Sequence, residues 1–257
     1  MALPIYEIYA VKYAGPFVRP ASMILWFHDL DKSTAVNYYL FVVRGGGETI
    51  VVDCGVSPGL ARRRALRGYV NPAEALRRLG IDARRVQHLV ATHIHFDHIS
   101  GISLFPRATV YLQEREFAFW IDDPVARRAP FLHVSDLAAN RAVARLRDSP
   151  RLRLIRGDRT ILPGIRLLLC PGHTPGIQAV AVNTARGTAV LGSDIGHTFE
   201  NYRRDIPSAL ITDMVAWMGS FDKVRAAASS PDLLFPGHDV ALMTAYPKVA
   251  RDVTRLA

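Results

Sequence analysis

Apolar positions in the first third of the chain occur in short runs separated by turn residues, a pattern typical of β-strands. The first run covers Ile5–Tyr13, and the second covers Tyr38–Val43. A third run, Thr49–Val52, follows after the turn at Gly45–Gly47. Because glycine readily adopts the backbone angles of tight turns, the second and third runs predict a β-hairpin.

Strand-like and helix-like stretches alternate in the rest of the chain. Further strands are expected at Val86–Thr92, Thr109–Leu112, Arg151–Ile155, Ile165–Cys170, Gln178–Asn183, Thr188–Gly192 and Leu233–Phe235. Helices are expected at Asn71–Gly80, Gln113–Trp120, Ser135–Arg147, Asp213–Ala228 and Tyr246–Leu256. Strands with interspersed helices occur in both halves, which predicts an α+β fold, an αββα sandwich. No Gly-, Pro- or Ser-rich linker divides residues 1–257, so we interpret them as a single domain.

Four side chains that commonly bind metals lie within six residues of the sequence. They follow the apolar run that ends at Thr92, and they are His93, His95, Asp97 and His98. Imidazole nitrogens and carboxylate oxygens suit Zn²⁺, and a strand that opens into a loop can direct several of them at one point. A lone histidine is more often structural, but three with an aspartate among them are hard to explain as core or surface. The cluster therefore predicts a metal site.

Three more candidate ligands each stand at the end of an apolar run. They are His173, Asp194 and His238. Both histidines follow a Pro-Gly pair, and the aspartate follows Gly-Ser. Glycine beside a ligand permits backbone geometry that other residues resist and leaves room for a metal. The recurrence of ligands at strand ends strengthens the prediction of a metal site.

Charge and composition narrow the function further. The 257 residues carry a net charge of +9, and all but four of the 32 basic residues are arginine. These arginines are dispersed, with small clusters such as Arg62–Arg64, and no nucleic-acid recognition motif accompanies them. We therefore expect no nucleic-acid partner, while a preference for anionic substrates stays open. Neither a membrane span of roughly 18 apolar residues nor a signal peptide is found, so we expect a cytoplasmic protein without a membrane partner.

This set of residues resembles the metallo-β-lactamase superfamily over nearly the whole chain. The shared pattern is HxHxDH followed by a histidine, an aspartate and a histidine. The resemblance implies two divalent ions per chain, with Zn²⁺ expected. It assigns the first ion to His93, His95 and His173, the second to Asp97, His98 and His238, and makes Asp194 the bridge. It also implies that Asp53, at the end of the third strand, orients the histidine cluster.

Within the superfamily, the chain is most similar to the N-acyl homoserine lactonases, which act in quorum quenching. It shares with them the HxHFDH form, the PGHTPG segment at Pro171–Gly176 and the PGHD segment at Pro236–Asp239. Lactonases commonly have a tyrosine three residues after the bridging aspartate, where His197 stands here. The histidine that often follows HTPG is replaced by Ile177. These departures concern the substrate more than the reaction class.

The expected function is enzymatic hydrolysis of a small-molecule substrate, a lactone or a related cyclic carbonyl compound. The resemblance implies that hydroxide between the two ions attacks the carbonyl carbon, because divalent ions lower the pKa of water from about 15.7 toward neutrality. Asp97 or Asp194 would carry the proton, and His197 would donate to the oxyanion. Hydrolysis of a thioester, amide or phosphodiester is the alternative, and a non-catalytic binding protein is the third reading. A homodimer is left open.

Aromatic residues are the candidates to line an apolar substrate pocket. They are Trp26, Phe27, Phe119, Trp120, Phe199 and Tyr202. Each taken singly is more a core candidate than a pocket candidate, because aromatic side chains chiefly fill interiors. The pair Trp26 and Phe27, in an expected loop before the first hairpin, is the candidate for a substrate lid.

Overall fold

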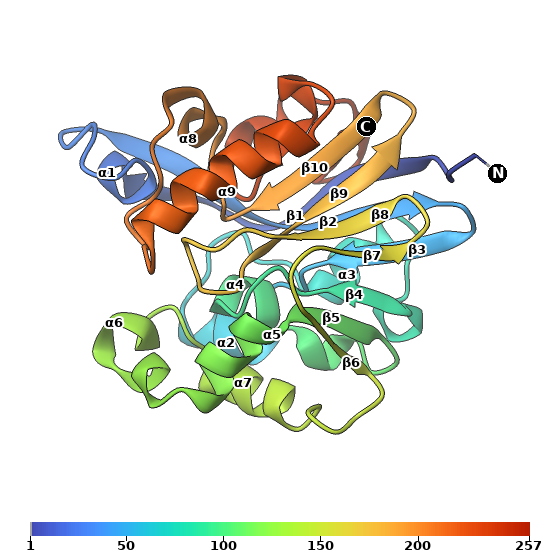
Figure 1. The fold of residues 1–257 in the computed structure, drawn as a ribbon, viewed down its shortest axis with the longest axis horizontal. Helices are drawn as coiled ribbons and strands as arrows, with labels where there is room; N and C mark the ends of the chain where they lie inside the picture. Colours follow the sequence, from blue (N-terminus) through green and yellow to red (C-terminus); the bar gives the residue numbers. More distant parts are fainter. Residues whose placement is uncertain (1) are drawn as a thin grey trace.

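The computed structural model describes residues 2–257, and it contains two β-sheets that face each other (Figure 1). In spatial order, the larger sheet contains β12 (Lys248–Ala250), β13 (Val253–Arg255), β1 (Tyr6–Pro20), β2 (Ser33–Gly45), β3 (Glu48–Val52), β4 (His88–Val90), β5 (Thr109–Gln113) and β6 (Leu152–Ile155). The smaller sheet contains β11 (Leu234–Pro236), β10 (Gly187–Ser193), β9 (Gln178–Thr184), β8 (Ile165–Leu169) and β7 (Arg159–Leu162).

Helices cover the outer faces of both sheets (Figure 1). They are α1 (Ala21–Ile24), α2 (Pro58–Arg63), α3 (Pro72–Arg77), α4 (Phe96–Ile99), α5 (Glu114–Phe117), α6 (Ala129–Leu132), α7 (Leu137–Ala144), α8 (Phe199–Arg204) and α9 (Met214–Ala227). The fold is thus the expected αββα sandwich. Within residues 2–257, none of the helices has the length and apolar character that crossing a membrane requires.

Three apolar layers hold the sandwich together. Residues such as Phe41, Leu167 and Phe235 fill the space between the two sheets. The other face of the larger sheet packs against α2, α3, α5 and α7, and the other face of the smaller sheet packs against α9 through Trp217. Burial of both faces of each sheet explains why the strands read as nearly continuous apolar runs rather than alternating ones.

The direction of the strands places the candidate ligands at one edge of the sandwich. β3, β4 and β5 run parallel to one another, and β10 runs parallel to β11. The ends of parallel strands meet at the same edge of a sheet, so the segments that follow β3 and β4 lie together. The segments after β10 and β11 meet in the same way on the opposing sheet. Thus Asp53, the histidine cluster, Asp194 and His238 all leave their strands toward one region.

Most expected elements occur, but several limits differ. The N-cap of α3 is Asn71, as expected, and its side chain accepts a hydrogen bond from the Ala73 amide at 3.0 Å. The N-cap of α7 is Asp136 rather than Ser135, because the Asp136 carboxylate accepts from the Ala138 amide. The helix expected over 113–120 is α5 followed by a π-helical segment, Ala118–Asp122.

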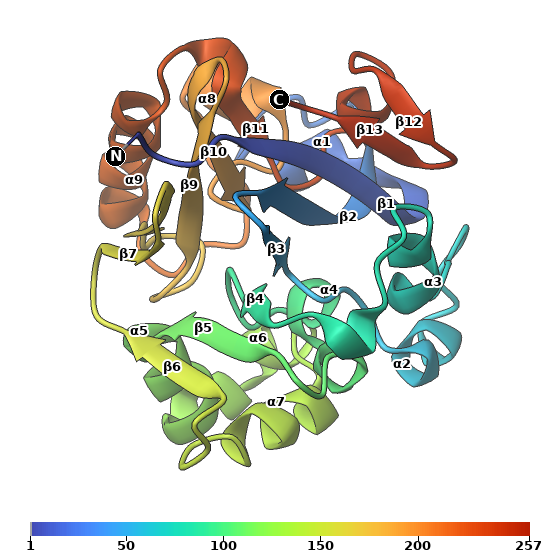
Figure 2. The same ribbon diagram turned by 90° about the vertical axis from the view of Figure 1, so that its right-hand side faces the viewer.

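The expected helix over Tyr246–Leu256 is wrong. This segment forms β12 and β13, an antiparallel pair that extends the larger sheet alongside β1, as Figure 2 shows. Valine and threonine favour strands, and pairing with β1 satisfies backbone groups that a short helix at the surface would leave to water. A tight turn at Arg251 and Asp252 separates the two short strands.

The terminal hairpin gives a test of this correction. Val249 and Val253 would share one face of a helix, since side chains four positions apart lie above one another. In the hairpin, Val253 is 0% exposed and Val249 is 48% exposed. We therefore expect Val253→Asp to lower the free energy of unfolding by about 3 kcal/mol or more, because it buries an unpaired charge. The control, Val249→Asp, should change it by less than about 0.5 kcal/mol in denaturant unfolding. Equal losses would contradict the hairpin.

Candidate metal centre

The seven side chains that the sequence singled out as metal ligands lie together in the structure. They fall into two groups whose nitrogen and oxygen atoms lie within 4.8 Å of one another: His93, His95, His173 and Asp194 form the first, and Asp97, His98 and His238 form the second. All seven are buried. A third group of the same kind joins Asp194 and His238 to His197. The folded chain thus brings ligands from both sheets to one place.

The Asp194 carboxylate lies between the two groups. Its Oδ2 is 3.4 Å from His173 Nε2 and 3.8 Å from His93 Nε2. Its Oδ1 is 2.9 Å from His238 Nε2 and 3.4 Å from His98 Nε2. Each oxygen of one carboxylate therefore faces a different set of imidazoles, which is the geometry that a shared ligand requires.

The donor atoms at the centre fit a metal site. Among residues 2–257, His93 Nε2, His98 Nε2 and Asp194 Oδ1 are buried side-chain atoms without a hydrogen-bond partner. An unpaired buried polar atom is costly, so such atoms in one small space call for a group that the chain itself does not supply. Imidazole nitrogens with carboxylate oxygens are the donor set of zinc and related divalent ions. The residues present therefore fit divalent metals.

Asp53 fixes the orientation of His98. Its Oδ2 accepts a hydrogen bond from His98 Nδ1 at 2.7 Å, which leaves His98 Nε2 facing the centre. Its Oδ1 accepts from both the amide and the hydroxyl of Thr92 at 2.8 and 2.9 Å. The Thr92 hydroxyl also lies 3.0 Å from His93 Nδ1. One buried carboxylate thus holds the start of the histidine cluster, as a carboxylate behind a metal-binding histidine commonly does.

Two other histidines are oriented by backbone carbonyls that sequence motifs did not reveal. His173 Nδ1 lies 2.9 Å from the Leu210 carbonyl, and His238 Nδ1 lies 2.8 Å from the Asn37 carbonyl. In a neutral imidazole, when one ring nitrogen donates its proton to a carbonyl, the other nitrogen keeps a free electron pair that can bind a metal. In both rings, this second nitrogen, Nε2, is the one that faces Asp194.

Glu116 was also missed by the sequence analysis, and it connects two ligand loops. This fully buried carboxylate in α5 accepts from the Ile94 amide at 2.8 Å, in the loop of the histidine cluster. It also accepts from the Thr174 hydroxyl at 2.7 Å and the Gly176 amide at 2.9 Å, in the loop that holds His173. Burial raises its pKa, and these hydrogen bonds oppose the shift. Its only sequence signal was a glutamate on the inner side of a short helix.

Glycine is required beside two of the ligands. A Cβ on Gly237, next to His238, would lie 2.6 Å from Asp194 Oδ1. Gly172, next to His173, has φ +146°, and a Cβ there would lie 2.3 Å from the Cβ of Trp217. Both distances are far inside van der Waals contact, so the Pro-Gly-His sequence reflects close packing around the ligands.

Burial and neighbouring charges divide the histidines by their pKa values. Burial lowers the pKa of His93 and His95 well below the ordinary value, and it lowers the pKa of His197 to about 3. Burial opposes protonation of His98 as well, but the Asp194, Asp97 and Asp53 carboxylates outweigh it and raise its pKa. The Asp194 carboxylate also raises the pKa of His238, against the effect of burial. His93, His95 and His197 are therefore neutral near pH 7, the form in which a histidine binds a metal.

A cavity of about 470 Å³ opens onto this centre. His95, Asp97, Asp194, His197 and His238 contribute to its wall. The rest of the wall is mostly apolar and comes from the end of β1, from α1, from β2 and from residues 134 and 210. A smaller cavity of about 270 Å³, lined by Trp120 and Phe131, lies on the other side of His95. A small molecule thus has access to the candidate ligands.

The aromatic residues proposed for the pocket mostly lie elsewhere. Trp120 is buried with its ring 5.2 Å from that of His95, and it lines the smaller cavity. Phe119, Phe199 and Tyr202 pack into the three apolar layers instead. Trp26 and Phe27 are exposed, Phe27 by 72%, and neither belongs to the described wall of the larger cavity. Of the six, Trp120 alone lines one of these two cavities, because core packing holds the rings of Phe119, Phe199 and Tyr202.

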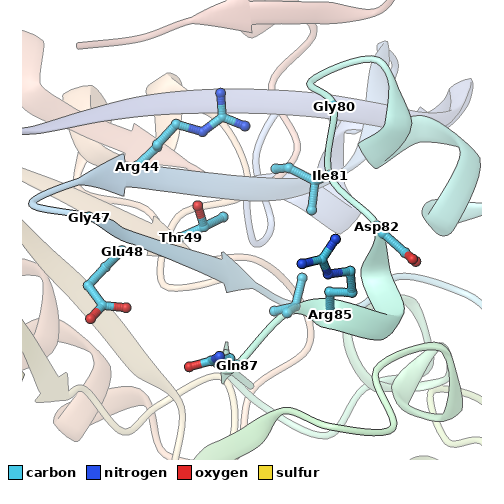
Figure 3. Close-up of a pocket in the computed structure, with 10 residues that line it drawn as sticks. Arg44, Gly47, Glu48, Thr49, Gly80, Ile81, Asp82, Arg85 and Gln87 are labelled. Atoms are coloured by element: carbon cyan, nitrogen blue, oxygen red, sulfur yellow. The ribbon is translucent and has the colours of Figure 1, made fainter.

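Another cavity, of about 580 Å³, lies away from these ligands. It is formed by the turn between β2 and β3 and by residues 80–87, with Arg44, Glu48, Asp82 and Arg85 among its lining (Figure 3). Thr49 and Gln87 stand at the beginnings of β3 and β4, whereas the ligands follow the ends of those strands. This open polar hollow is therefore at the opposite edge of the sheet, away from the candidate metal centre.

Comparison with known proteins agrees with the geometry. An N-acyl homoserine lactonase of Bacillus sp is 26% identical over 211 residues, which are 74% of this chain and 76% of that protein. The N-acyl homoserine lactonase AttM of Azorhizobium caulinodans is 28% identical over 164 residues, 63% of this chain and 61% of its own. The crystal structure of a quorum-quenching N-acyl homoserine lactone lactonase superposes with a TM-score of 0.79 at 20% identity, covering 97% of this chain and 98% of that one.

The family model provides the broadest match. Residues 33–238 match the model of the metallo-beta-lactamase superfamily, and they include every candidate ligand from His93 to His238. The family model agrees with the sandwich fold, with the candidate ligands at strand ends and with the similar proteins. This chain belongs to the metallo-beta-lactamase superfamily.

Proposed function

We propose that this protein is a dinuclear metal-dependent hydrolase that opens a lactone or a related cyclic carbonyl compound. The observation that carries the proposal is the placement of Asp194, whose two oxygens face two sets of imidazoles at the base of an open cavity. Similar proteins from Bacillus and Azorhizobium are N-acyl homoserine lactonases, which supports lactone chemistry.

Seven residues would hold two divalent ions, with Zn²⁺ favoured by the donor set. His93, His95 and His173 would bind the first, Asp97, His98 and His238 the second, and Asp194 both. When bound, such ions lower the pKa of a coordinated water toward neutrality and polarise a carbonyl oxygen. The chain supplies the placement: Asp53, Glu116 and two backbone carbonyls hold the ligands in a fixed orientation.

Three side chains in the cavity are suited to the steps of ring opening. Asp97 and Asp194 line the cavity, where either carboxylate would accept the proton of the attacking water and pass it to the leaving alkoxide. His197 Nε2 lies 3.3 Å from Asp194 Oδ2. We assign His197 a hydrogen bond to the oxygen of the carbonyl under attack, the role that a tyrosine has in the lactonases. The apolar wall would hold the rest of the substrate away from water.

The first test is metal content and substrate class. Elemental analysis of protein purified without chelator should find about two transition-metal ions per chain. Chelation should abolish hydrolysis of a γ-lactone, and added Zn²⁺ should restore it. A panel of lactones, thioesters, amides and phosphodiesters assayed with the metal-loaded enzyme should give the highest kcat/KM with a lactone. Full activity with less than one ion per chain would overturn the dinuclear assignment.

Removal of the shared carboxylate should cost more activity than removal of its supporting one. Asp194→Ala removes the one ligand assigned to both ions, so kcat should fall by several orders of magnitude. Asp53→Asn keeps every ligand and disturbs only the hydrogen bonds of Asp53 with His98 and Thr92, so the loss of activity should be about 10- to 100-fold. Steady-state kinetics with matched metal content measures both. If Asp194→Ala retains activity within tenfold of the natural protein, the shared-ligand assignment is wrong.

Substitution of His197 tests whether this residue is a hydrogen-bond donor or an additional metal ligand. If it donates to the oxyanion, His197→Ala should lower kcat about 10²- to 10³-fold, the usual effect of losing one such donor. Metal content should stay unchanged, and His197→Tyr should recover part of the loss by restoring a hydroxyl donor. A variant that loses metal together with activity would instead make His197 a ligand, as its place beside Asp194 and His238 allows. An intact kcat would make it a bystander.

A further inference from the structure

Two arginines line the cavity above the candidate metal centre. Arg19 comes from the end of β1, and Arg64 follows directly after α2. Arg64 belongs to the cluster Arg62–Arg64 that the sequence shows, and its two neighbours do not belong to the described wall of the cavity. One arginine of this exposed basic cluster therefore lies at the candidate active site.

Aromatic rings hold both guanidinium groups in place. The Arg64 guanidinium lies 3.8 Å from the centre of the Phe96 ring, and the Arg19 guanidinium lies 5.3 Å from the centre of the Phe17 ring. Arg64 also donates to the His133 carbonyl at 2.8 Å. Phe96 is the residue between His95 and Asp97, so Arg64 is attached to the ligand loop itself. Stacking on a ring restricts an arginine without neutralising its charge.

The charge of these two arginines is not matched within the described chain. Elsewhere arginines pair with carboxylates, for example Arg78 with Asp252 and Arg225 with Asp205. Within residues 2–257, neither Arg19 nor Arg64 forms an ion pair with a carboxylate. The acidic residues of the cavity wall, Asp97 and Asp194, instead face the histidines. Two positioned cations are therefore available to a bound molecule.

The remaining wall limits what that molecule is. Val18, Met23, Ile24, Val36 and Leu210 present aliphatic surface to the same cavity. A substrate that fits all of it has a carbonyl group at the metal ligands, an apolar stretch along the wall, and a group that accepts hydrogen bonds from guanidinium. Carboxylate and phosphate oxygens match the planar fork of arginine best, and such charge-assisted hydrogen bonds are about twice as strong as neutral ones.

We propose that the cavity selects substrates whose arm carries an anionic oxygen group, a carboxylate or a phosphate, bound by Arg19 and Arg64. This inference rests on the proposed lactone hydrolysis and adds the substrate's charge to it. The cations act on binding, not on the reacting bond, so the selection should lie mainly in KM. A simple neutral acyl lactone would occupy the same apolar wall but leave both guanidinium groups without an anionic partner.

The experiment uses three γ-lactones that differ only at the end of the arm: a methyl group, a carboxylate and a phosphate monoester. With the metal-loaded enzyme, we expect kcat/KM to be about 10- to 100-fold higher for at least one anionic compound than for the methyl compound, with the difference in KM. Arg64→Gln and Arg19→Gln should each reduce this ratio several-fold, and Arg64→Lys should retain part of it. The comparison of the two anions decides between carboxylate and phosphate.

Matched controls exclude other sources of the preference. Arg63→Gln removes a neighbouring exposed arginine outside the cavity wall and should leave the ratio unchanged. If the anion binds the metals directly, the ratio will persist in both cavity variants, and the proposal is overturned. Equal kcat/KM for the methyl and anionic compounds overturns it as well. Thermal unfolding of each variant checks that the fold is intact.

A second measurement separates this inference from the proposed function. The same three arms on a γ-lactam, whose ring resists hydrolysis, are titrated into the metal-loaded protein by calorimetry. Tighter binding of an anionic lactam than of the methyl lactam, if it is lost in Arg64→Gln, supports the charge selection. If no lactone is hydrolysed in that case, only the lactone assignment fails. Binding that ignores the charge of the arm overturns the inference whatever the lactone assay gives.

Discussion

The structure depends on the burial of many polar ligand atoms around one carboxylate, Asp194. Five imidazole rings surround this group at its two oxygens, and all of them are buried. Such a concentration of polar atoms opposes folding unless each ring is held in one orientation and its inward nitrogen is satisfied. The fold meets the first condition from behind the rings, and divalent metals, which the donor atoms fit, would meet the second. Binding of such metals would therefore be coupled to the packing of the two sheets.

The groups that orient the rings differ in how clearly the sequence indicates them. Asp53 stands in a recognisable hydrophobic-Asp-x-Gly turn, so its role behind His98 could be anticipated. The carbonyls of Leu210 and Asn37 have no sequence signature, because every residue has a carbonyl and only the folded path of the chain selects these two. Glu116 lies between these extremes: it is a distinctive residue, but nothing local indicates that it connects two loops about 80 residues apart in sequence.

The same distinction separates the parts of the fold that were predictable from those that were not. Ligands at strand ends were evident, because motif and strand are adjacent in sequence. The terminal hairpin was not, since β12 and β13 exist through their contact with β1, which is almost the whole chain away. The cavity wall was also missed. Phe119 and Tyr202, which were expected there, are held in the core, and the wall combines aliphatic side chains with Tyr38, Phe96 and two arginines.

The cavity wall and the ligands come from separate parts of the chain. Most ligands stand on the loops that follow β4, β8, β10 and β11, between the sheets, whereas much of the wall comes from the far ends of β1 and β2 with α1, which extend to the left in Figure 1. Of the orienting contacts described above, the one in that extension is the Asn37 carbonyl on His238, a backbone group that side-chain substitutions leave in place. Substitutions there can accumulate without disturbing the costly buried centre. Descendants of one ancestral enzyme could thus diverge in the compounds they consume while inheriting the same catalytic apparatus.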